Sequence, residues 1–375
     1  MILLRSSEIK SPDFLIKMKL IKRKTKVIKI GKVRIGGDHP VAIQSMTKTK
    51  TSDINRTNEE IRKLENAGCE IVRLAVKDSQ DARAFKKIRR STRLPLVADI
   101  HFNWRLAIEA IDNGADKIRL NPGNIYKKEE IKNIVSALKQ AKIPLRVGVN
   151  SGSVRDLNSA RSSLADRLVK GALDYVKIIE DMNFYNIVIS LKASSVLDTI
   201  EAYRKISKIC DYPMHLGLTA TGFPFQGAIK SSIAIGVLLL EGIGDTIRVS
   251  LTDQPVHEIR AARYILESLG LRHFGPQIIS CPTCGRCQVD LIKLVKQFEN
   301  KLNTVNCKLL TANSQPLRVA LMGCEVNGPG EAREADIGIA FGKKTGVLFR
   351  KGEIEKKVSY ANSLGYLLNE LKKRR

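Results

Sequence analysis

The stretch "VAIQSMTKTKTSDINRTNEEIRKLENAGCEIVRLAV", residues 41–76, contains one complete unit of a repeating pattern. Its two ends, 41–46 and 71–76, are short apolar runs of the length and composition of buried strands. Between them, residues 58–68 place Ile61 and Leu64 at helical spacing and end at Gly68, a common helix terminator. The stretch therefore predicts a strand, a helix and a second strand in succession.

The same alternation continues to about residue 270. The apolar runs that we interpret as strands are 41–46, 71–76, 94–100, 117–121, 144–150, 186–193, 213–219 and 246–251. Strand–helix units in series are typical of a parallel (β/α)₈ barrel, although a doubly wound open sheet also alternates in this way. Eight units favour the barrel. We predict an α/β fold with a TIM-type barrel over residues 41–272. Residues 1–40 before it would form a basic N-terminal extension and the entry of the chain into the barrel.

The pattern changes over residues 273–375. This part has a group of cysteines, a helical stretch at 289–302, a strand at 317–323, two further strands and a closing amphipathic helix. It predicts a small α+β domain. The Gly and Pro residues of "NGPG" favour a tight turn after the strand at 317–323, which could present Cys324 and Glu331 on the same side.

Composition limits the classes of partner. The chain has 375 residues, 43% hydrophobic and 27% charged, as a packed soluble protein does. A net charge of +26 would suit a nucleic-acid-binding protein, but the chain has one Trp and no module that interleaves aromatic and basic residues. We therefore expect no nucleic acid, and a basic surface that attracts anionic substrates and acidic proteins.

The cysteines and the apolar runs bear on location. Seven cysteines, an odd number, without a secretory signal indicate a reducing compartment rather than a disulfide framework. The longest apolar run, residues 233–240, is shorter than the roughly 20 residues that span a bilayer. We expect a cytoplasmic protein that does not enter a membrane.

Five of the strands carry a cation in an apolar frame. These are Arg73, Arg119, Arg146, Lys192 and Arg248. One such residue alone would be interpreted as snorkelling from a strand end or pairing with an acid. A barrel, however, aims its strand ends at one mouth, where five cations are tolerable only around a polyanion. The pattern predicts a phosphate or diphosphate site, to which Asn150 and Ser250, farther along two of these strands, would add neutral donors.

The stretch "CPTCGRC" at 281–287 predicts a metal site. Cys281 and Cys284 have a spacing that lets two thiolates reach one metal, and Cys287 is near. Structural zinc sites use this spacing but usually pair two such turns, whereas Cys324 stands alone. An incomplete thiolate set is compatible with an iron–sulfur cluster that leaves one iron open to a substrate. Spacing favours iron–sulfur only slightly and leaves zinc open.

Nine segments together carry a resemblance to a known family. They are "IQSMTKTKTSD", "VADIHF", "IRLNPGNI", "RVGVNSGS", "LKAS", "HLGLT", "EGIGDTIRVSL", "CPTC" and "GCEVNGPGEA". In this order and spacing, the chain resembles the 4-hydroxy-3-methylbut-2-enyl diphosphate synthases of the two-domain bacterial type. The resemblance covers nearly everything after about residue 27.

The resemblance implies a function and a ligand set. It implies reductive ring opening and dehydroxylation of 2-C-methyl-D-erythritol 2,4-cyclodiphosphate to (E)-4-hydroxy-3-methylbut-2-enyl diphosphate, in the methylerythritol phosphate pathway to isoprenoids. Ferredoxin or flavodoxin would supply the electrons, and the five strand cations match the diphosphate-binding positions of the family. A [4Fe–4S] cluster would be bound by Cys281, Cys284, Cys324 and Glu331, with Cys287 a bystander. The resemblance also implies a homodimer in which the barrel of one subunit faces the cluster domain of the other.

Three positions carry the expected catalytic roles, and a fourth departs from the family. Glu331 would be the iron ligand that yields to substrate oxygen, while Asp99 and His101 would transfer a proton or position other groups. Ala220 stands where the family has a glutamate that is thought to matter for activity. Two alternatives follow: a catalytically impaired relative that keeps the cluster and the fold, and a zinc-stabilised barrel that binds anions without redox chemistry.

Overall fold

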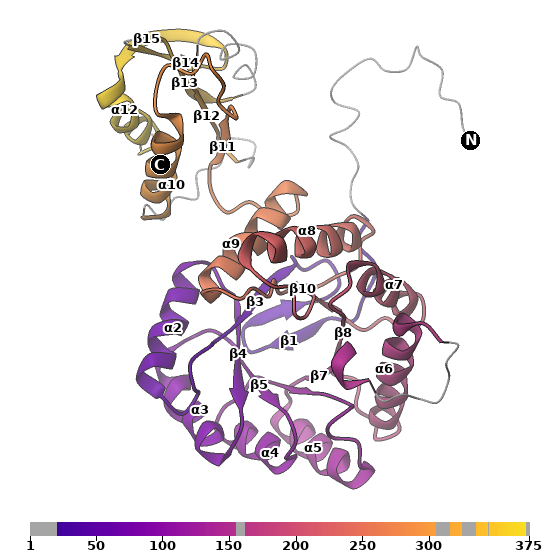
Figure 1. Cartoon of the computed structure of the whole chain (residues 1–375). Helices are drawn as coiled ribbons and strands as arrows, with labels where there is room; N and C mark the ends of the chain where they lie inside the picture. The colour runs from indigo at the N-terminus through magenta and orange to yellow at the C-terminus, as the bar shows by residue number, and fades with distance from the viewer. Residues whose placement is uncertain (1–20, 155–161, 305–315, 325–334, 344, 373–375) are drawn as a thin grey trace, which may run out of the picture. The chain divides into compact units, whose positions relative to one another are not determined.

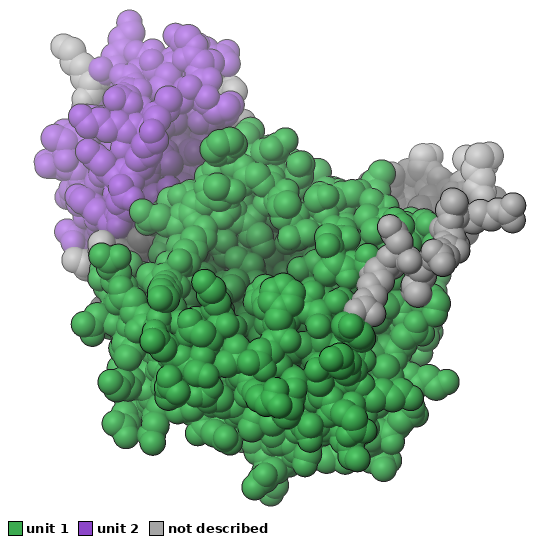
Figure 2. All heavy atoms as spheres, turned by 60° about the horizontal axis from the view of Figure 1, so that its bottom comes forward, with its two compact units in different colours: residues 1–272 green, residues 273–375 purple. Residues whose placement is uncertain are grey.

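The computed structural model describes residues 21–154, 162–304, 316–324, 335–343 and 345–372. The chain divides into two compact units, Met1–Arg272 and His273–Arg375, which Figure 2 shows in green and purple. We call them the barrel unit and the cluster unit. No helix among the described residues is long and apolar enough to cross a membrane.

The barrel unit contains a parallel sheet of eight strands. They are β3 (Ala42–Met46), β4 (Ile71–Val76), β5 (Leu96–Ile100), β6 (Lys117–Leu120), β7 (Leu145–Asn150), β8 (Ile187–Lys192), β9 (His215–Leu216) and β10 (Thr246–Ile247). The order is β8-β7-β6-β5-β4-β3-β10-β9, and a single bridge between Ile189 and Met214 joins the two ends of the sheet. The predicted barrel and its eight strands are confirmed.

Helices surround this ring of strands (Figure 1). They are α2 (Ile54–Asn66), α3 (Ser79–Ser91), α4 (Arg105–Asp112), α5 (Lys128–Ala141), α6 (Leu164–Glu180), α7 (Val196–Ser207), α8 (Pro224–Leu240) and α9 (Pro255–Ser268), with a short 3₁₀ helix, η1, at Ser151–Ser153. Polar residues just before several of them start the helix: Asp53, Asp78 and Ser195 each accept a hydrogen bond from a backbone N–H of the first turn.

A hairpin that the sequence pattern did not reveal closes one end of the barrel. Strands β1 (Ile28–Ile30) and β2 (Val33–Ile35) pair antiparallel. Their buried isoleucines pack against residues at the beginnings of barrel strands, namely Ala42, Ile71, Val97 and Val188. Because the strands are parallel, this apolar cluster lies at the end of the barrel opposite the carboxyl ends of the strands. Runs of three residues are too short to show a period, which is why the hairpin was not predicted.

The cluster unit contains a five-stranded sheet. Its strands are β11 (Gln277–Ser280), β12 (Arg318–Met322), β13 (Ile337–Phe341), β14 (Thr345–Arg350) and β15 (Glu353–Ser359), and its helices are α10 (Leu291–Thr304) and α12 (Tyr360–Lys372). β11, β12 and β13 are parallel, whereas β14 and β15 continue the sheet antiparallel. The predicted small α+β domain is thus confirmed. Strand β11 and the largely exposed β15 were not predicted from the sequence.

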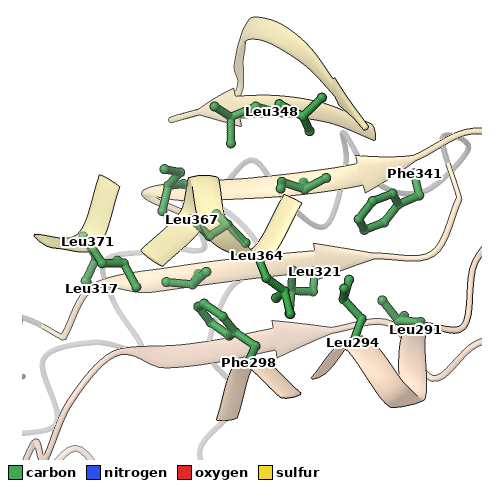
Figure 3. Packing of buried hydrophobic residues seen from close by; sticks show 14 residues of the cluster. Leu291, Leu294, Phe298, Leu317, Leu321, Phe341, Leu348, Leu364, Leu367 and Leu371 are labelled. Atoms are coloured by element: carbon green, nitrogen blue, oxygen red, sulfur yellow. The ribbon is translucent and has the colours of Figure 1, made fainter. Parts of the chain in front are cut away.

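The two helices of the cluster unit pack on the sheet through one apolar core (Figure 3). Phe298 of α10 and Leu367 of α12 are fully buried there, with Leu321 and Phe341 of the sheet. This core supports the edge of the sheet at which the cysteines lie.

Candidate functional site

The five predicted cations converge inside the barrel. Arg73, Arg119, Arg146 and Lys192 are 7%, 4%, 0% and 5% exposed, and the side chain of Arg248 is 14% exposed. Burial lowers the pKa of Lys192 well below its ordinary value, and the neighbouring Arg73, Arg248, Arg146 and Arg119 lower it further. The strands therefore bring together, from separate parts of the sequence, the cations that sequence analysis selected.

Asp99 connects two of these arginines. Its Oδ1 lies 2.9 Å from Arg119 Nη1, and its Oδ2 lies 3.6 Å from Arg73 Nε. Burial alone would raise the pKa of Asp99, but Arg73 and Arg119 hold it well below its usual range. Asp99 is therefore an ionised carboxylate that orients guanidinium groups, and these contacts favour positioning over proton donation for this residue.

His101 lies at the rim of the same group. Its Nε2 is 3.8 Å from Asp99 Oδ2, and its side chain is 48% exposed. A half-exposed imidazole at this position can face both the solvent and a bound ligand.

Two glycines in the barrel wall make room for the cations. A Cβ on Gly148 would lie 2.6 Å from Arg119 Nε, and one on Gly217 would lie 2.9 Å from Lys192 Nζ. Arg119 also donates to the Gly148 carbonyl at 3.0 Å. Sequence analysis missed both glycines, although a glycine inside an aliphatic strand is a known signal of close approach by another group.

Glu258 of α9 is a second carboxylate that sequence analysis missed. It is 2% exposed and accepts hydrogen bonds from Ser45 Oγ at 2.9 Å and from the Leu251 N–H at 3.1 Å. It also pairs with Arg248 Nη2 at 3.3 Å. Glu258 thus orients Arg248 as Asp99 orients Arg119.

The predicted neutral donors lie on the same strand ends. Asn150 is the last residue of β7, in register with Lys192, and is partly exposed. Ser250 is also partly exposed and donates from Oγ to the Leu218 carbonyl at 3.2 Å. The Asn150 amide is thus available to a ligand at the mouth of the barrel, whereas the Ser250 hydroxyl would donate to one only by leaving the Leu218 carbonyl.

Ala220 lies in the loop between β9 and α8. Its φ of 52° is in the left-handed region, and it is exposed. The next residue, Thr221, donates from its hydroxyl to the Ser250 carbonyl, and the Thr252 N–H donates to the Gly222 carbonyl at 3.1 Å. These bonds hold the loop against the segment that carries Ser250, so the missing side chain at Ala220 leaves the loop beside Ser250 without a carboxylate.

Two of the predicted cluster ligands share one edge of the sheet in the cluster unit. Cys281 directly follows β11, and Cys324 comes two residues after β12, its parallel neighbour. The Gly323 N–H donates to Cys281 Sγ at 3.3 Å. The carboxyl ends of the two strands therefore bring these distant thiols to the same side of the sheet.

The other two cysteines of the turn differ in exposure. Cys284 is exposed, and hydrogen bonds from the backbone and side chain of Arg286 lower the pKa of its thiol. Cys287 packs against the apolar core, with its Sγ 3.2 Å from the Val289 carbonyl oxygen. Within the described residues, no group of three or more His, Cys, Asp or Glu side chains is close enough to hold a metal, and Glu331 lies outside those residues. The ligand set stays a prediction.

The sequence matches two family domains in tandem. Residues 25–263 match the GcpE TIM-barrel domain, and residues 277–373 match the GcpE protein C-terminal domain. Together they cover both units.

Relatives of known name match over nearly their whole length. The 4-hydroxy-3-methylbut-2-en-1-yl diphosphate synthase (flavodoxin) of Fusobacterium nucleatum is 50% identical over 355 residues, which are 94% of this chain and 97% of the relative. The proteins of the same name from Caldanaerobacter subterraneus and Clostridium perfringens are 51% and 52% identical, over 94% and 90% of this chain and 98% and 95% of their own.

Proposed function

This chain belongs to the GcpE family of 4-hydroxy-3-methylbut-2-en-1-yl diphosphate synthases, and we propose how its two units divide the reaction. The chain is an iron–sulfur oxidoreductase of the methylerythritol phosphate pathway. It opens the ring of 2-C-methyl-D-erythritol 2,4-cyclodiphosphate by reduction and removes a hydroxyl group. In the proposal, the barrel unit binds the diphosphate and the cluster unit supplies the electrons.

The observation that carries the barrel's role is a set of five largely buried cations that outnumber the two carboxylates beside them, Asp99 and Glu258. In the described part of the chain, Arg146 and Lys192 form no ion pair, whereas Asp99 and Glu258 are engaged by Arg119, Arg73 and Arg248. Buried charges without a partner are costly, and a diphosphate would offset that cost. We therefore assign the diphosphate to Arg73, Arg119, Arg146, Lys192 and Arg248, with Asn150 and Ser250 as neutral donors.

The orientation of these donors matters more than their number. Asp99 fixes the guanidinium of Arg119 before the substrate arrives, and Gly148 leaves the space that it occupies. A preorganised guanidinium loses little entropy when it binds a phosphate oxygen bidentately. The substrate's carbon–oxygen bonds are thus positioned by groups that do not themselves react.

In the cluster unit, we assign a [4Fe–4S] cluster to Cys281, Cys284, Cys324 and Glu331. Such a cluster would supply the electrons of the reduction, and Glu331, a harder ligand than a thiolate, would be the ligand most readily exchanged. Two of the thiols lie at the carboxyl ends of adjacent parallel strands, which supports the assignment. Cys287 lies outside this proposed ligand set, and its Sγ is 3.2 Å from the Val289 carbonyl oxygen.

The departing oxygen requires a proton. Because Asp99 is held ionised between two arginines, we assign proton donation to His101, which is half-exposed and lies 3.8 Å from Asp99.

The electrons come from outside the chain. The relatives' names specify flavodoxin, and a net charge of +26 suits an acidic electron carrier of this kind. We propose flavodoxin, rather than ferredoxin, as the donor. Free thiols throughout the described residues suit the reducing cytoplasm, which is the compartment we propose.

We also propose a homodimer, in which the barrel of one subunit faces the cluster unit of the other. Helix α8 supports a second copy, because Phe225, Ile229 and Ile233 form an exposed apolar row at helical spacing. Phe225→Glu should halve the mass measured by light scattering, whereas Leu197→Glu, at an exposed leucine of α7, should leave it unchanged.

The experiment that tests the proposed function uses the full chain purified without oxygen and loaded with iron and sulfide. We expect broad absorbance near roughly 400 nm and conversion of the cyclic diphosphate with reduced flavodoxin. A colourless protein that retains stoichiometric zinc and binds the substrate without converting it would contradict the redox function.

A further inference from the structure

A layer of polar side chains lies inside the barrel beneath the proposed diphosphate site. Gln44, Lys117, Arg146, His215 and Thr246 come from five strands, and each is at most 1% exposed. Only Arg146 belongs to the proposed diphosphate site. The other four have no role in the function described above.

The order of residues along the strands places this layer. Lys117, His215 and Thr246 are the first residues of β6, β9 and β10, whereas Lys192 is the last residue of β8. In a parallel barrel, first residues lie toward the end opposite the mouth. On the far side, the hairpin β1–β2 and its apolar cluster close the barrel. The layer therefore lies between a sealed apolar end and the diphosphate site.

Hydrogen bonds within the layer give partners to only some of its buried polar atoms. Lys117 Nζ donates to Gln44 Oε1 at 3.4 Å, and His215 Nδ1 lies 2.8 Å from Thr246 Oγ1. Four buried nitrogens have no partner: Arg146 Nε, Arg146 Nη1, Gln44 Nε2 and His215 Nε2. Neither Lys117 nor Arg146 is in ion-pair contact with any residue that the structure describes, although Asp99 is near enough to raise the pKa of Arg146.

The unsatisfied atoms are of one chemical kind. Guanidinium and amide nitrogens can only donate, and His215 Nε2 donates when Nδ1 accepts from the Thr246 hydroxyl. The Lys117, Arg146 and His215 side chains are near enough to act electrostatically on one another. A water molecule would accept few of these hydrogen bonds and would bring no charge. An anion accepts several hydrogen bonds and compensates the buried cations.

We propose that this layer binds one small inorganic anion, a halide of the size of chloride, and keeps it when the diphosphate is bound at the mouth. The unpartnered nitrogens come from three strands, β3, β7 and β9, and their side chains are at most 1% exposed, which favours a small monatomic anion over a larger polyatomic one. Burial, with Arg146 and Arg73 nearby, lowers the pKa of Lys117 well below its ordinary value, and a bound anion would favour its charged form. The inference does not rest on the proposed redox function.

Bromide, which scatters anomalously, is the direct probe. Crystals of the full chain, grown without chloride and soaked in sodium bromide, should show an anomalous peak among Lys117, Arg146, Gln44 and His215. The peak should remain when the cyclic diphosphate is also soaked in. Its absence, or its loss on adding the diphosphate, would overturn the proposal, since the layer would then hold water or part of the substrate.

Variants test the same site in solution. With ionic strength held constant by sodium gluconate, added chloride should raise the thermal unfolding midpoint of the wild type in a saturable way, because a ligand that binds the folded state stabilises it. Lys117→Met should raise the chloride dissociation constant at least tenfold, and Gln44→Met should also weaken binding. Lys128→Met, at an exposed lysine, should respond as the wild type does.

Two results in solution would refute the site. The first is an equal response of the wild type to chloride and to gluconate. The second is a full chloride response in Lys117→Met or, if that variant does not fold, in Gln44→Met.

Discussion

Arg119 Nη1 lies 2.9 Å from Asp99 Oδ1 inside the barrel, and the arginine's other terminal nitrogen donates to the Gly148 carbonyl at 3.0 Å. The pair fixes a guanidinium before any ligand is present. Arg119→Met should therefore weaken binding of the cyclic diphosphate by about 1.5–3 kcal/mol, the usual value of a hydrogen bond to a charged group. Calorimetric titration would measure it, with the exposed Arg93→Met as a control that binds as the wild type does. Unchanged affinity in Arg119→Met would mean that the pair is only structural.

The same pair predicts a dependence of stability on pH. Because the folded state holds the pKa of Asp99 below its unfolded value of about 3.9, its ionisation stabilises the fold above that pH. This contribution is lost as the pH falls through the unfolded value toward the folded one. Denaturant unfolding from pH 6 to about pH 3 should show a steeper loss of stability in the wild type than in Asp99→Asn. Parallel curves would show that Asp99 is not ionised in the fold.

The cluster ligands can be separated by single substitutions. Cys281→Ser, Cys284→Ser and Cys324→Ser should each lose most of the bound iron, whereas Cys287→Ser should retain it, because Cys287 lies outside the proposed ligand set and its Sγ contacts the Val289 carbonyl oxygen. Iron content and absorbance after anaerobic reconstitution would measure the difference. If Cys287→Ser lost as much iron as the others, the ligand assignment in this turn would be wrong.

Ala220 tests whether the barrel mouth lacks a general acid. A positioned acid is typically worth about 10²–10⁴-fold in rate. If its absence limits this chain, Ala220→Glu should raise turnover at least tenfold with little change in cluster content. Ala220→Gln is the control, since both variants keep a Cβ at the same left-handed φ of 52°. Slower turnover in Ala220→Glu would mean that another acid, such as His101, already serves the reaction.

Tyr203 links β8 to β9, the two strands that close the barrel. Its hydroxyl accepts from the Leu191 N–H at 3.0 Å and donates to the His215 carbonyl at 2.5 Å, across strands that share a single bridge. Tyr203→Phe leaves both groups buried without a partner and should lower the free energy of unfolding by about 1–3 kcal/mol. Tyr185→Phe, at an exposed tyrosine, should change it little. Equal stability of the two variants in urea would contradict this role.

The barrel was predictable because its signal is local. Each strand is a run of aliphatic residues, and a cation such as Arg146 within such a run is conspicuous in the sequence. Lys117 was overlooked because it precedes Arg119 by two residues in the same strand and was not distinguished from it. The inward direction of both became evident only from the register of β6 with its neighbours.

The residues that support the site were not predictable in the same way. Glu258 lies on α9, 10 residues after Arg248, and an acid in the first turn of a helix is ordinarily interpreted as favourable to the helix dipole. Gly148 and Gly217 act by lacking a side chain, which the sequence shows only once the neighbouring cation is known. Pairing across strands, rather than any local pattern, creates these contacts.

One measurement tests the central claim most directly: a single-turnover reaction of the anaerobically reduced full chain with the cyclic diphosphate, followed by ³¹P nuclear magnetic resonance. We expect the signals of the cyclic diphosphate to be replaced by those of a linear diphosphate monoester, with two electrons consumed for each product molecule formed. Arg119→Met with an intact cluster should give the same product only at higher substrate concentration. Persistence of the cyclic signals in the presence of a reduced cluster and bound substrate would contradict the account.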